Sequence, residues 1–187
     1  MKTAILFSAP SGSGKTTIIK QLMKEYDCFE FSISATSRVP RQGEVDGVDY
    51  YFLTPDEFES RVRQGLFLEW EEVYEGTRYG TLKSEIDRIR AKGKMVIFDV
   101  DVNGGVNIKR YFGDEALAIF VMPPSIEVLE QRLRSRGTES EESIKKRLGR
   151  SARELLESDK FDVTIVNDDL HRAVEETKEV VDEFVNS

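Results

Sequence analysis

The sequence predicts an α/β protein in which helices flank a parallel, five-stranded sheet, with a smaller α+β lobe inserted and a helical lid. Two observations predict this class. Apolar runs of strand length alternate with helical stretches, which is typical of a parallel sheet covered on both faces. Two polar segments then interrupt the alternation, and the pattern resumes after each. At 187 residues the chain has the length of one domain.

The core strands are predicted from short apolar runs rich in β-branched residues. The expected strands are residues 3–8 (TAILFS), 29–33, 95–98 (MVIF), 117–122 (LAIFVM) and 163–166 (VTIV). The expected helices are residues 16–25, 103–112, 125–135 and 170–185. In the first of these helices Ile18, Ile19 and Leu22 share one side, as expected of a helix that packs on a sheet.

The two interruptions predict the insertions. Residues 34–81 are polar, with glycines and aromatics, and are expected to form short strands and one helix, whose start is marked by the capping box Thr54-Pro55-Asp56-Glu57. Residues 137–157 are expected to form a charged helical lid. We therefore predict one domain with a core (1–33, 82–136 and 158–187), a lobe (34–81) and a lid (137–157).

Residues 9–17 (APSGSGKTT) form a glycine-rich turn between the first strand and the first helix. Its end fits the phosphate-binding pattern G-x-x-x-x-G-K-[ST], but Ala9 stands where the pattern has its first glycine. The short pattern is weak alone; the strand–helix context favours a phosphate-binding loop, because unpaired N–H groups at a helix start attract anions. The alternative is an ordinary Ser- and Gly-rich turn. Alanine in place of this glycine weakens the match only if the backbone at position 9 needs a positive φ.

Lys15 and Thr16 follow this turn, so the lysine can reach β- and γ-phosphates and the hydroxyl can bind Mg²⁺. A magnesium site usually includes a carboxylate at the end of a neighbouring strand. Asp99 and Asp101 follow the apolar run MVIF and are expected to face the same side. The alternative is that they cap the next helix or pair with arginines.

Arg38 and Arg41 lie three residues apart around a proline, and their planar guanidinium groups suit a phosphate. Tyr50 adds a hydroxyl donor. A stretch of this kind is otherwise a solvated surface loop.

The segment FLEWEEVYEGTRYGT, residues 67–81, carries several carboxylates. A carboxylate can accept hydrogen bonds from both N1–H and the 2-amino group of guanine, a donor pair that adenine lacks. Glu69, between Leu68 and Trp70, is a candidate for this role. The alternative is a solvated acidic face.

Basic residues outnumber acidic ones between Arg132 and Arg153. Arginines that close over a phosphoryl group in transfer stabilise its spreading negative charge. Arg132 and Arg136 are four residues apart and share one helix face, and Arg147 lies in the predicted lid. A solvated helix face is the alternative for part of this set.

Composition excludes several classes of protein. The net charge of −8 argues against nonspecific binding to nucleic acid or membranes. One cysteine, Cys28, permits no internal disulfide and suggests a reducing cytoplasm, and one His and one Cys exclude Cys/His metal clusters. No apolar run has the length of a membrane span.

Taken together, these pieces resemble the guanylate kinase family of ATP:GMP phosphotransferases over nearly the whole chain. The resemblance rests on SAPSGSGKTT, FSISATSRVPRQGEVDGVDYYF, FLEW, YGT, IFDVDVNG, PPS, RLRSRGTESEESIKKRL and IVNDDL. Adenylate kinases share the loop but not this insert. The resemblance implies a P-loop NTPase core, ATP and GMP (with dGMP) as small-molecule substrates, and Mg²⁺. We expect a monomer or homodimer with no nucleic-acid or membrane partner.

The resemblance also implies roles for particular residues. It places guanine against Ser34, Glu69, Thr81 and Asp101, and the GMP phosphate against Arg38, Arg41, Tyr50 and Tyr79. It places ATP against Ala9, Pro10, Ser11, Gly12, Ser13, Gly14, Lys15, Thr16, Thr17 and Asn167, with Mg²⁺ on Thr16 and Asp99. The group in transfer would be stabilised by Lys15, Arg38, Arg132, Arg136 and Arg147.

The sequence departs from the family at Ala9, at Thr81 where serine is common, and at Asn103-Gly104-Gly105, which replaces a Gln-Gly stretch. None of these changes removes a charge that the reaction needs. Two alternatives to a guanylate kinase stay open: a binding module of the same fold without catalysis, and a kinase for another nucleoside monophosphate. His171, in the last helix, is expected to be structural or exposed.

Overall fold

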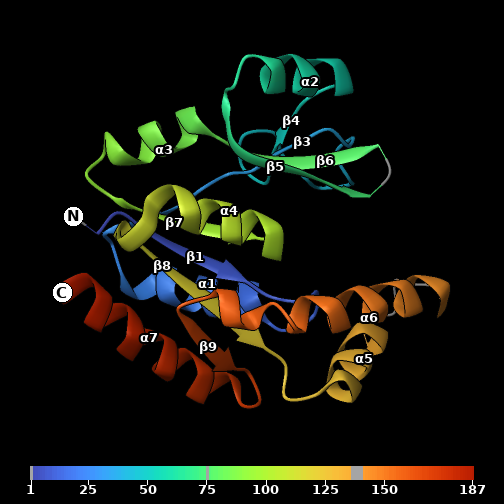
Figure 1. Ribbon diagram of the computed structural model, residues 1–187, viewed down its shortest axis with the longest axis vertical. Helices are drawn as coiled ribbons and strands as arrows, with labels where there is room; N and C mark the ends of the chain where they lie inside the picture. The colour runs from blue at the N-terminus through green and yellow to red at the C-terminus, as the bar shows by residue number, and fades with distance from the viewer. Residues whose placement is uncertain (1, 75, 136–140) are drawn as a thin grey trace.

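A computed structural model describes residues 2–74, 76–135 and 141–187 (Figure 1). Its larger sheet is parallel, with the strand order β2-β7-β1-β8-β9. The strands are β1 (Ala4–Ser8), β2 (Phe29–Phe31), β7 (Met95–Val100), β8 (Ala116–Met122) and β9 (Val163–Val166). The prediction of a five-stranded parallel sheet flanked by helices is confirmed.

Helices bury both faces of this sheet, which explains why its strands are apolar throughout. α1 (Lys15–Glu25) and α7 (Leu170–Asn186) pack on one face, and α3 (Lys83–Arg90) and α4 (Val102–Phe112) on the other. Every residue of β1 is buried. The central strand therefore holds the loop that follows it on a rigid base.

The register of β1 and β7 places two predicted site segments side by side. Phe7 pairs with Asp99 and Ser8 with Val100. The turn that follows β1 therefore begins beside Asp99. Since both strands run in the same direction, both segments lie at the carboxyl edge of the sheet, where open α/β sheets bind ligands.

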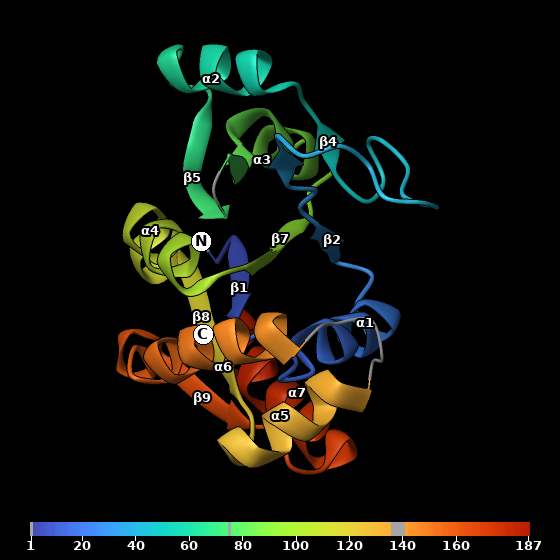
Figure 2. The same ribbon diagram turned by 90° about the vertical axis from the view of Figure 1, so that its right-hand side faces the viewer.

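A second, four-stranded sheet has the order β4-β3-β6-β5 and lies at one end of the molecule, with α5, α6 and α7 toward the other end (Figure 2). Its elements are β3 (Ala35–Thr36), β4 (Tyr51–Phe52), α2 (Pro55–Arg63), β5 (Phe67–Tyr74) and β6 (Thr77–Leu82). It has its own small core around Phe58 and Phe67, whose rings stack 4.4 Å apart. The capping box at Thr54 and Glu57 is present and starts α2. The lobe boundaries, 34–81, stay a prediction.

The helix α3 has no counterpart among the predicted elements. It is only eight residues long, and Ile86 and Ile89 are its buried apolar residues, so its periodic signal is weak. Its start is stabilised by tertiary contacts instead. The buried carboxylate of Glu85 accepts hydrogen bonds from Ile33 N and Tyr51 Oη, at 3.0 and 2.9 Å.

Two helices and two short 3₁₀ turns complete the fold. They are α5 (Ile126–Ser135), α6 (Glu141–Leu155), η1 (Gly113–Glu115) and η2 (Ser158–Lys160). α6 lies within the predicted lid, whose residues 137–140 are outside the described residues. Only Ile144 and Ser151 of α6 are buried, and its other residues are partly or fully exposed. None of the helices described is both long and apolar enough to span a membrane.

Gly80 in β6 sits where β5 passes closest. A Cβ added to it would lie 2.7 Å from both the carbonyl oxygen of Glu69 and the Cβ of Trp70. We expect Gly80→Ala to lower the free energy of unfolding by about 1–3 kcal/mol, the usual cost of overpacking. Urea unfolding measures this. Gly149→Ala in α6 is the control, because a Cβ there meets nothing within 4 Å and helix propensity favours alanine. Equal stability of Gly80→Ala and the unmodified chain would contradict the close approach.

Candidate functional site

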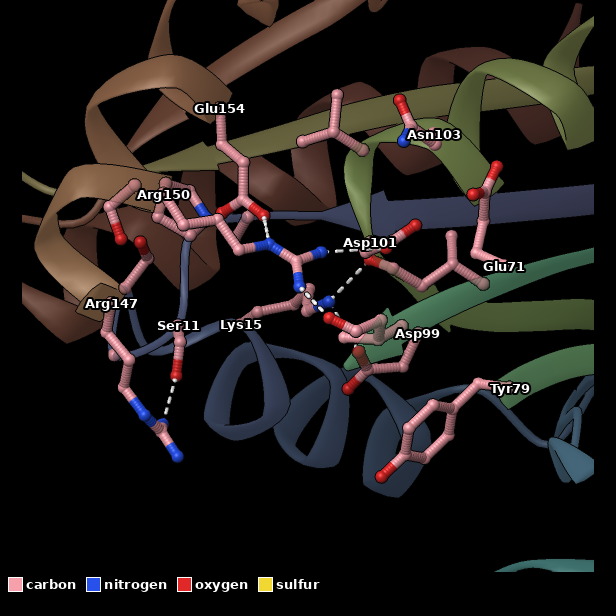
Figure 3. Close-up of a pocket in the computed structure, with 18 of the residues that line it drawn as sticks. Ser11, Lys15, Glu71, Tyr79, Asp99, Asp101, Asn103, Arg147, Arg150 and Glu154 are labelled. Atoms are coloured by element: carbon pink, nitrogen blue, oxygen red, sulfur yellow. Dashed lines mark hydrogen bonds and ion pairs between the residues drawn. The ribbon is translucent and has the colours of Figure 1, made fainter. Parts of the chain in front are cut away.

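One cavity of about 1230 Å³ opens at the carboxyl edge of the parallel sheet (Figure 3). Its walls come from the turn after β1, the end of β7, the strands β5 and β6 of the second sheet, and α6. The volume exceeds that of a typical pocket for one drug-sized ligand. The cavity therefore has room for two ligands, one against the core and one against the second sheet.

The turn after β1 has the geometry of an anion-binding loop. Gly12 and Gly14 have φ of 100° and 91°, a conformation that favours glycine. Among the described residues, no side chain caps the start of α1, so the first N–H groups of the helix have no side-chain acceptor. The loop that leads into this helix start lines the cavity. Ala9 is buried and does not have a positive φ, so a methyl group fits there without strain.

Lys15, the first residue of α1, reaches across to β7. Its Nζ lies 2.5 Å from Asp99 Oδ1 and donates to the carbonyl of Val100 at 2.7 Å. Thr16 Oγ1 donates to the other oxygen of Asp99 at 3.1 Å. The register of the sheet brings these side chains together, because Asp99 pairs with the strand that ends just before the loop.

The hydroxyl of Thr16 and the carboxylate of Asp99 are adjacent hard oxygen donors, which suit Mg²⁺ when substrate phosphates supply further ligands. In the part of the chain that the structure describes, no group of three or more His, Cys, Asp or Glu side chains forms a metal cage. A hydroxyl and one carboxylate beside a phosphate loop fit an ion that arrives with a nucleotide.

The second sheet contributes a buried carboxylate. Glu69 in β5 is 9% exposed, and its Oε1 accepts a hydrogen bond from Thr81 Oγ1 of the neighbouring β6 at 2.7 Å. A Cβ on Gly104 would lie 3.1 Å from Glu69 Oε2 and 3.3 Å from Asp101 Oδ1. The carboxylates of Glu69 and Asp101 therefore lie close together, on either side of Gly104.

Burial raises the pKa of Glu69 to about 7; the hydrogen bond from Thr81 lowers it, and the nearby charge of Asp101 raises it further. A group with this pKa is partly protonated at neutral pH. A ligand that donates two hydrogen bonds to it would favour its ionised form. Perturbed carboxylates in a cavity are typical of functional sites.

Asp101 differs from the prediction that it shares a strand face with Asp99. β7 ends at Val100, so Asp101 is the N-cap of α4 and accepts from Gly104 N at 2.9 Å. Its other oxygen accepts from Arg150 Nη2 at 2.9 Å. Capping and ion pairing, the alternative that the sequence left open for the two aspartates, both occur at Asp101.

The two arginines proposed for a phosphate lie in the loop between β3 and β4 of the second sheet. Arg38 donates two hydrogen bonds to Glu44, at 2.6 and 2.7 Å, and one to Tyr79 Oη at 3.0 Å. The hydrogen bonds from Arg38 and from the Arg41 backbone lower the pKa of Glu44 to about 2. Glu44 thus orients the Arg38 guanidinium, and Tyr50 packs beside it with its ring centre 5.0 Å away.

Helices α5 and α6 bring basic side chains to the loop. Arg147 donates to Ser11 Oγ at 3.0 Å, and Arg150 points into the cavity between Glu154 and Asp101 (Figure 3). Arg132 donates to the backbone carbonyls of Asn167 and Ser13, at 3.0 and 3.5 Å. Arg132 therefore lies behind the loop and supports it.

Most of the predicted site residues line this cavity. They are Ala9, Pro10, Ser11, Gly12, Ser13, Gly14, Lys15, Thr16, Thr17, Ser34, Arg41, Tyr50, Glu69, Tyr79, Asp99, Asp101 and Arg147. Arg38, Thr81, Arg132 and Asn167 are not among the lining residues but contact residues that are. Arg136 lies outside the described residues.

Asn167, which the resemblance places against ATP, is 4% exposed and donates from Nδ2 to the carbonyl of Ser13 at 2.7 Å. Its amide thus fastens β9 to the loop. Sequence reasoning did not select Glu44, Glu71 or Glu154, and it included Arg150 only as one member of the basic segment, without a role of its own. Glu44, three residues after Arg41, and Glu154, four residues after Arg150, had usable local signals, whereas the contact of Arg150 with Asp101 joins residues far apart in the sequence. His171, expected to be either structural or exposed, is exposed.

A glycine-rich loop joins the central strand to a helix whose start no side chain caps. Lys15 stands at that start and Arg147 faces the loop. This architecture is that of a P-loop nucleotide kinase. A family model described as guanylate kinase matches residues 1–184. The chain belongs to the guanylate kinase family.

Individual relatives agree with this assignment. A guanylate kinase of Bacteroides thetaiotaomicron is 53% identical over 97% of this chain and 89% of the relative. One of Porphyromonas gingivalis is 50% identical over 99% of both chains. A crystal structure of guanylate kinase from Anaplasma phagocytophilum superimposes with a TM-score of 0.76 at 26% identity, over 97% of this chain and 85% of that one.

Proposed function

We propose that this protein transfers the γ-phosphoryl group of ATP to GMP and releases ADP and GDP. One observation carries the proposal: a single cavity contains both the phosphate loop with Lys15 and the buried carboxylate of Glu69. The loop suits a nucleoside triphosphate, and the carboxylate suits a base that presents two adjacent donors. Guanine has such a pair and adenine does not.

The donor nucleotide binds with its phosphates on residues 9–17. The N–H groups at the start of α1 hydrogen-bond the phosphate oxygens, and Lys15 moves from Asp99 to the β- and γ-phosphates. Thr16 and Asp99 would hold Mg²⁺, which when bound would neutralise charge on the β- and γ-phosphate oxygens. Asn167 and Arg132 keep the loop in place from behind.

The acceptor binds against the second sheet. Glu69 accepts from guanine, Thr81 keeps that carboxylate oriented, and Asp101 and Ser34 complete the base contacts. Arg38, Arg41, Tyr50 and Tyr79 hold the phosphate of GMP. Arg38 is already oriented by Glu44 and Tyr79, so little side-chain entropy is lost when it binds the phosphate.

In the transfer, an oxygen of the GMP phosphate attacks the γ-phosphorus and the bond from the γ-phosphorus to the β,γ-bridging oxygen breaks. The attacking oxygen is anionic, so the step needs no dedicated general base. Lys15 and Arg147 stabilise the charge on the group in transfer. Arg132 acts through the loop that it supports, and the family resemblance gives Arg136 a charge-stabilising role. Approach of α6 and the second sheet excludes water, which otherwise takes the phosphoryl group.

We propose a cytoplasmic enzyme of purine nucleotide metabolism that acts on small molecules, GMP and dGMP, and needs no nucleic acid or membrane. Monomer and homodimer are both compatible with a site built from one chain.

The test of this function is ADP formation from ATP and Mg²⁺ with GMP, AMP, CMP, UMP or dTMP as acceptor. We expect strong activity with GMP alone. Activity with another monophosphate would retain the phosphate loop but overturn the role of Glu69. Folded protein that binds GMP and transfers nothing would instead be a binding module with this fold.

We expect kcat/KM for GMP to depend on the ionisation of Glu69. Its pKa is raised to about 7, and only the carboxylate accepts both guanine donors, so kcat/KM falls as the pH drops through 7 and reaches a plateau above 8. At pH 6 it should be roughly tenfold below the plateau. A profile from pH 5.5 to 8.5 measures this.

The phosphate of GMP also titrates, with a pKa near 6. Glu69→Gln is the control, since it removes the inflection near pH 7 and keeps the one from the phosphate. A profile of the unmodified enzyme that is flat between pH 6.5 and 8 would contradict the role of Glu69.

A further inference from the structure

Arg150 of α6 connects three parts of the molecule at the guanine end of the cavity. Its Nη2 donates to Asp101 Oδ2 at 2.9 Å, its Nη1 donates to the backbone carbonyl of Val73 in β5 at 3.4 Å, and its Nε donates to Glu154 Oε1 at 2.6 Å (Figure 3). Asp101 belongs to the core and Val73 to the second sheet. A single lid side chain therefore joins the lid, the core and the second sheet.

The Asp101 carboxylate also faces the base site. It caps α4 through Oδ1, and its charge contributes to the raised pKa of Glu69. Each carboxylate oxygen has two lone pairs, so Oδ2 can accept from Arg150 and from a guanine donor together. Guanine in this position would bind beside a carboxylate that is already tied to α6.

The same helix reaches the other end of the cavity. Arg147 lies three residues before Arg150, and residues with this spacing are neighbours on a helix surface. Arg147 donates to Ser11 of the phosphate loop at 3.0 Å. Since α6 is one continuous helix from Glu141 to Leu155, the position of Arg150 determines where Arg147 can lie.

Glu154, one turn further on, holds the Arg150 guanidinium from the helix side. Burial raises the pKa of Glu154, and the hydrogen bond from Arg150 lowers it. The Arg150 side chain keeps about a third of its surface exposed (34%), and ion pairs with this exposure contribute little to overall stability. The Glu154–Arg150–Asp101 row is therefore better suited to positioning the helix than to holding the fold together.

We propose that Arg150 is a positioning residue that couples the two substrate sites: guanine bound at Asp101 and Glu69 holds Arg150, and through α6 places Arg147 over the donor phosphates. The proposal rests on the proposed function, because it assigns guanine and the donor nucleotide to the two ends of the cavity. Coupling of this kind is reciprocal, so each ligand raises the binding affinity of the other by the same factor.

The experiment measures that factor. Calorimetry gives the Kd of the β,γ-imido analogue of ATP, with Mg²⁺, in the absence and presence of saturating GMP. In the unmodified enzyme we expect saturating GMP to lower the Kd of the analogue at least about fivefold, which is the lower end of ordinary coupling between sites. In Arg150→Met the factor should fall below about twofold, while the Kd of each ligand alone changes less than about threefold.

Lys145→Met is the matched control. It removes one positive charge from the same helix at an exposed position, and we expect it to retain the coupling of the unmodified enzyme. Arg150→Lys keeps the charge but not the planar group that spans Asp101 and Glu154, and should retain only part of the factor. It also serves as the second variant if Arg150→Met does not fold.

Two results would overturn the inference. One is no coupling between GMP and the ATP analogue in the unmodified enzyme. The other is an undiminished coupling factor in folded Arg150→Met or, if that variant does not fold, in Arg150→Lys. A merely structural role would instead lower Tm and weaken both ligands alone, with an unchanged factor. Failure of the proposed function is distinguishable, because the unmodified enzyme would then not phosphorylate GMP at all.

Discussion

Lys15→Ala is expected to lower kcat by at least about a hundredfold, the scale on which one preorganised donor contributes to a transition state. The lysine stands at the start of α1 beside Asp99, where it is the charge nearest to the expected β- and γ-phosphates. Steady-state ADP release with saturating ATP and GMP measures the effect.

The fold should survive this change, because Lys15 is only partly buried and makes no contact in either core cluster. Lys20→Ala, on the exposed side of α1, is the control and should be as active as the unmodified enzyme. Turnover of folded Lys15→Ala within threefold of the unmodified rate would refute the assignment of residues 9–17 as the phosphate loop.

For Glu69→Ala we expect kcat/KM for GMP to fall by roughly 10⁴, since recognition through paired polar groups supports discrimination of that size. The variant loses the acceptor for two guanine donors and leaves Thr81 Oγ1, which is buried, without its partner. The Kd of the ATP analogue should hardly change, because the loop residues lie at the other end of the cavity. Kinetics with varied GMP and calorimetry with the analogue separate the two effects.

Glu69→Gln adds a sharper comparison. It keeps the shape but turns one acceptor oxygen into a donor amide, so it should also lose most of the GMP activity. Glu179→Gln on α7, an exposed site, controls for the loss of one negative charge. Unchanged GMP kinetics in Glu69→Ala would mean that another residue recognises guanine.

Much of the fold follows from local signals. The apolar runs, the strand–helix context of residues 9–17 and the capping box at Thr54 each lie within a few residues of chain, and the structure agrees with each of them. The helix α3 was missed for the same reason, because the contacts of Glu85 with Ile33 and Tyr51 come from residues far away in the sequence. A helix held by such contacts leaves little local pattern.

The candidate site divides in the same way. Lys15, Thr16 and the glycines of the loop follow from a motif in its context, whereas the guanine role of Glu69 was weak on residue type alone and rested on family resemblance. Acidic residues in a strand are usually solvated, and only the packing of β5 against β6 and α4 shows that this one is buried. Burial is also what raises its pKa.

The sequence by itself determined the parallel sheet, the anion-binding turn at the end of its first strand and the residue types available for phosphate and base. The tertiary structure decided how those residues are paired: Asp99 with Lys15 across two strands, and Asp101 with Arg150 of α6. The physical reason is range. Backbone preferences and periodicity act over a few neighbouring residues, while ion pairing and desolvation depend on which distant segments the fold brings within a few ångströms.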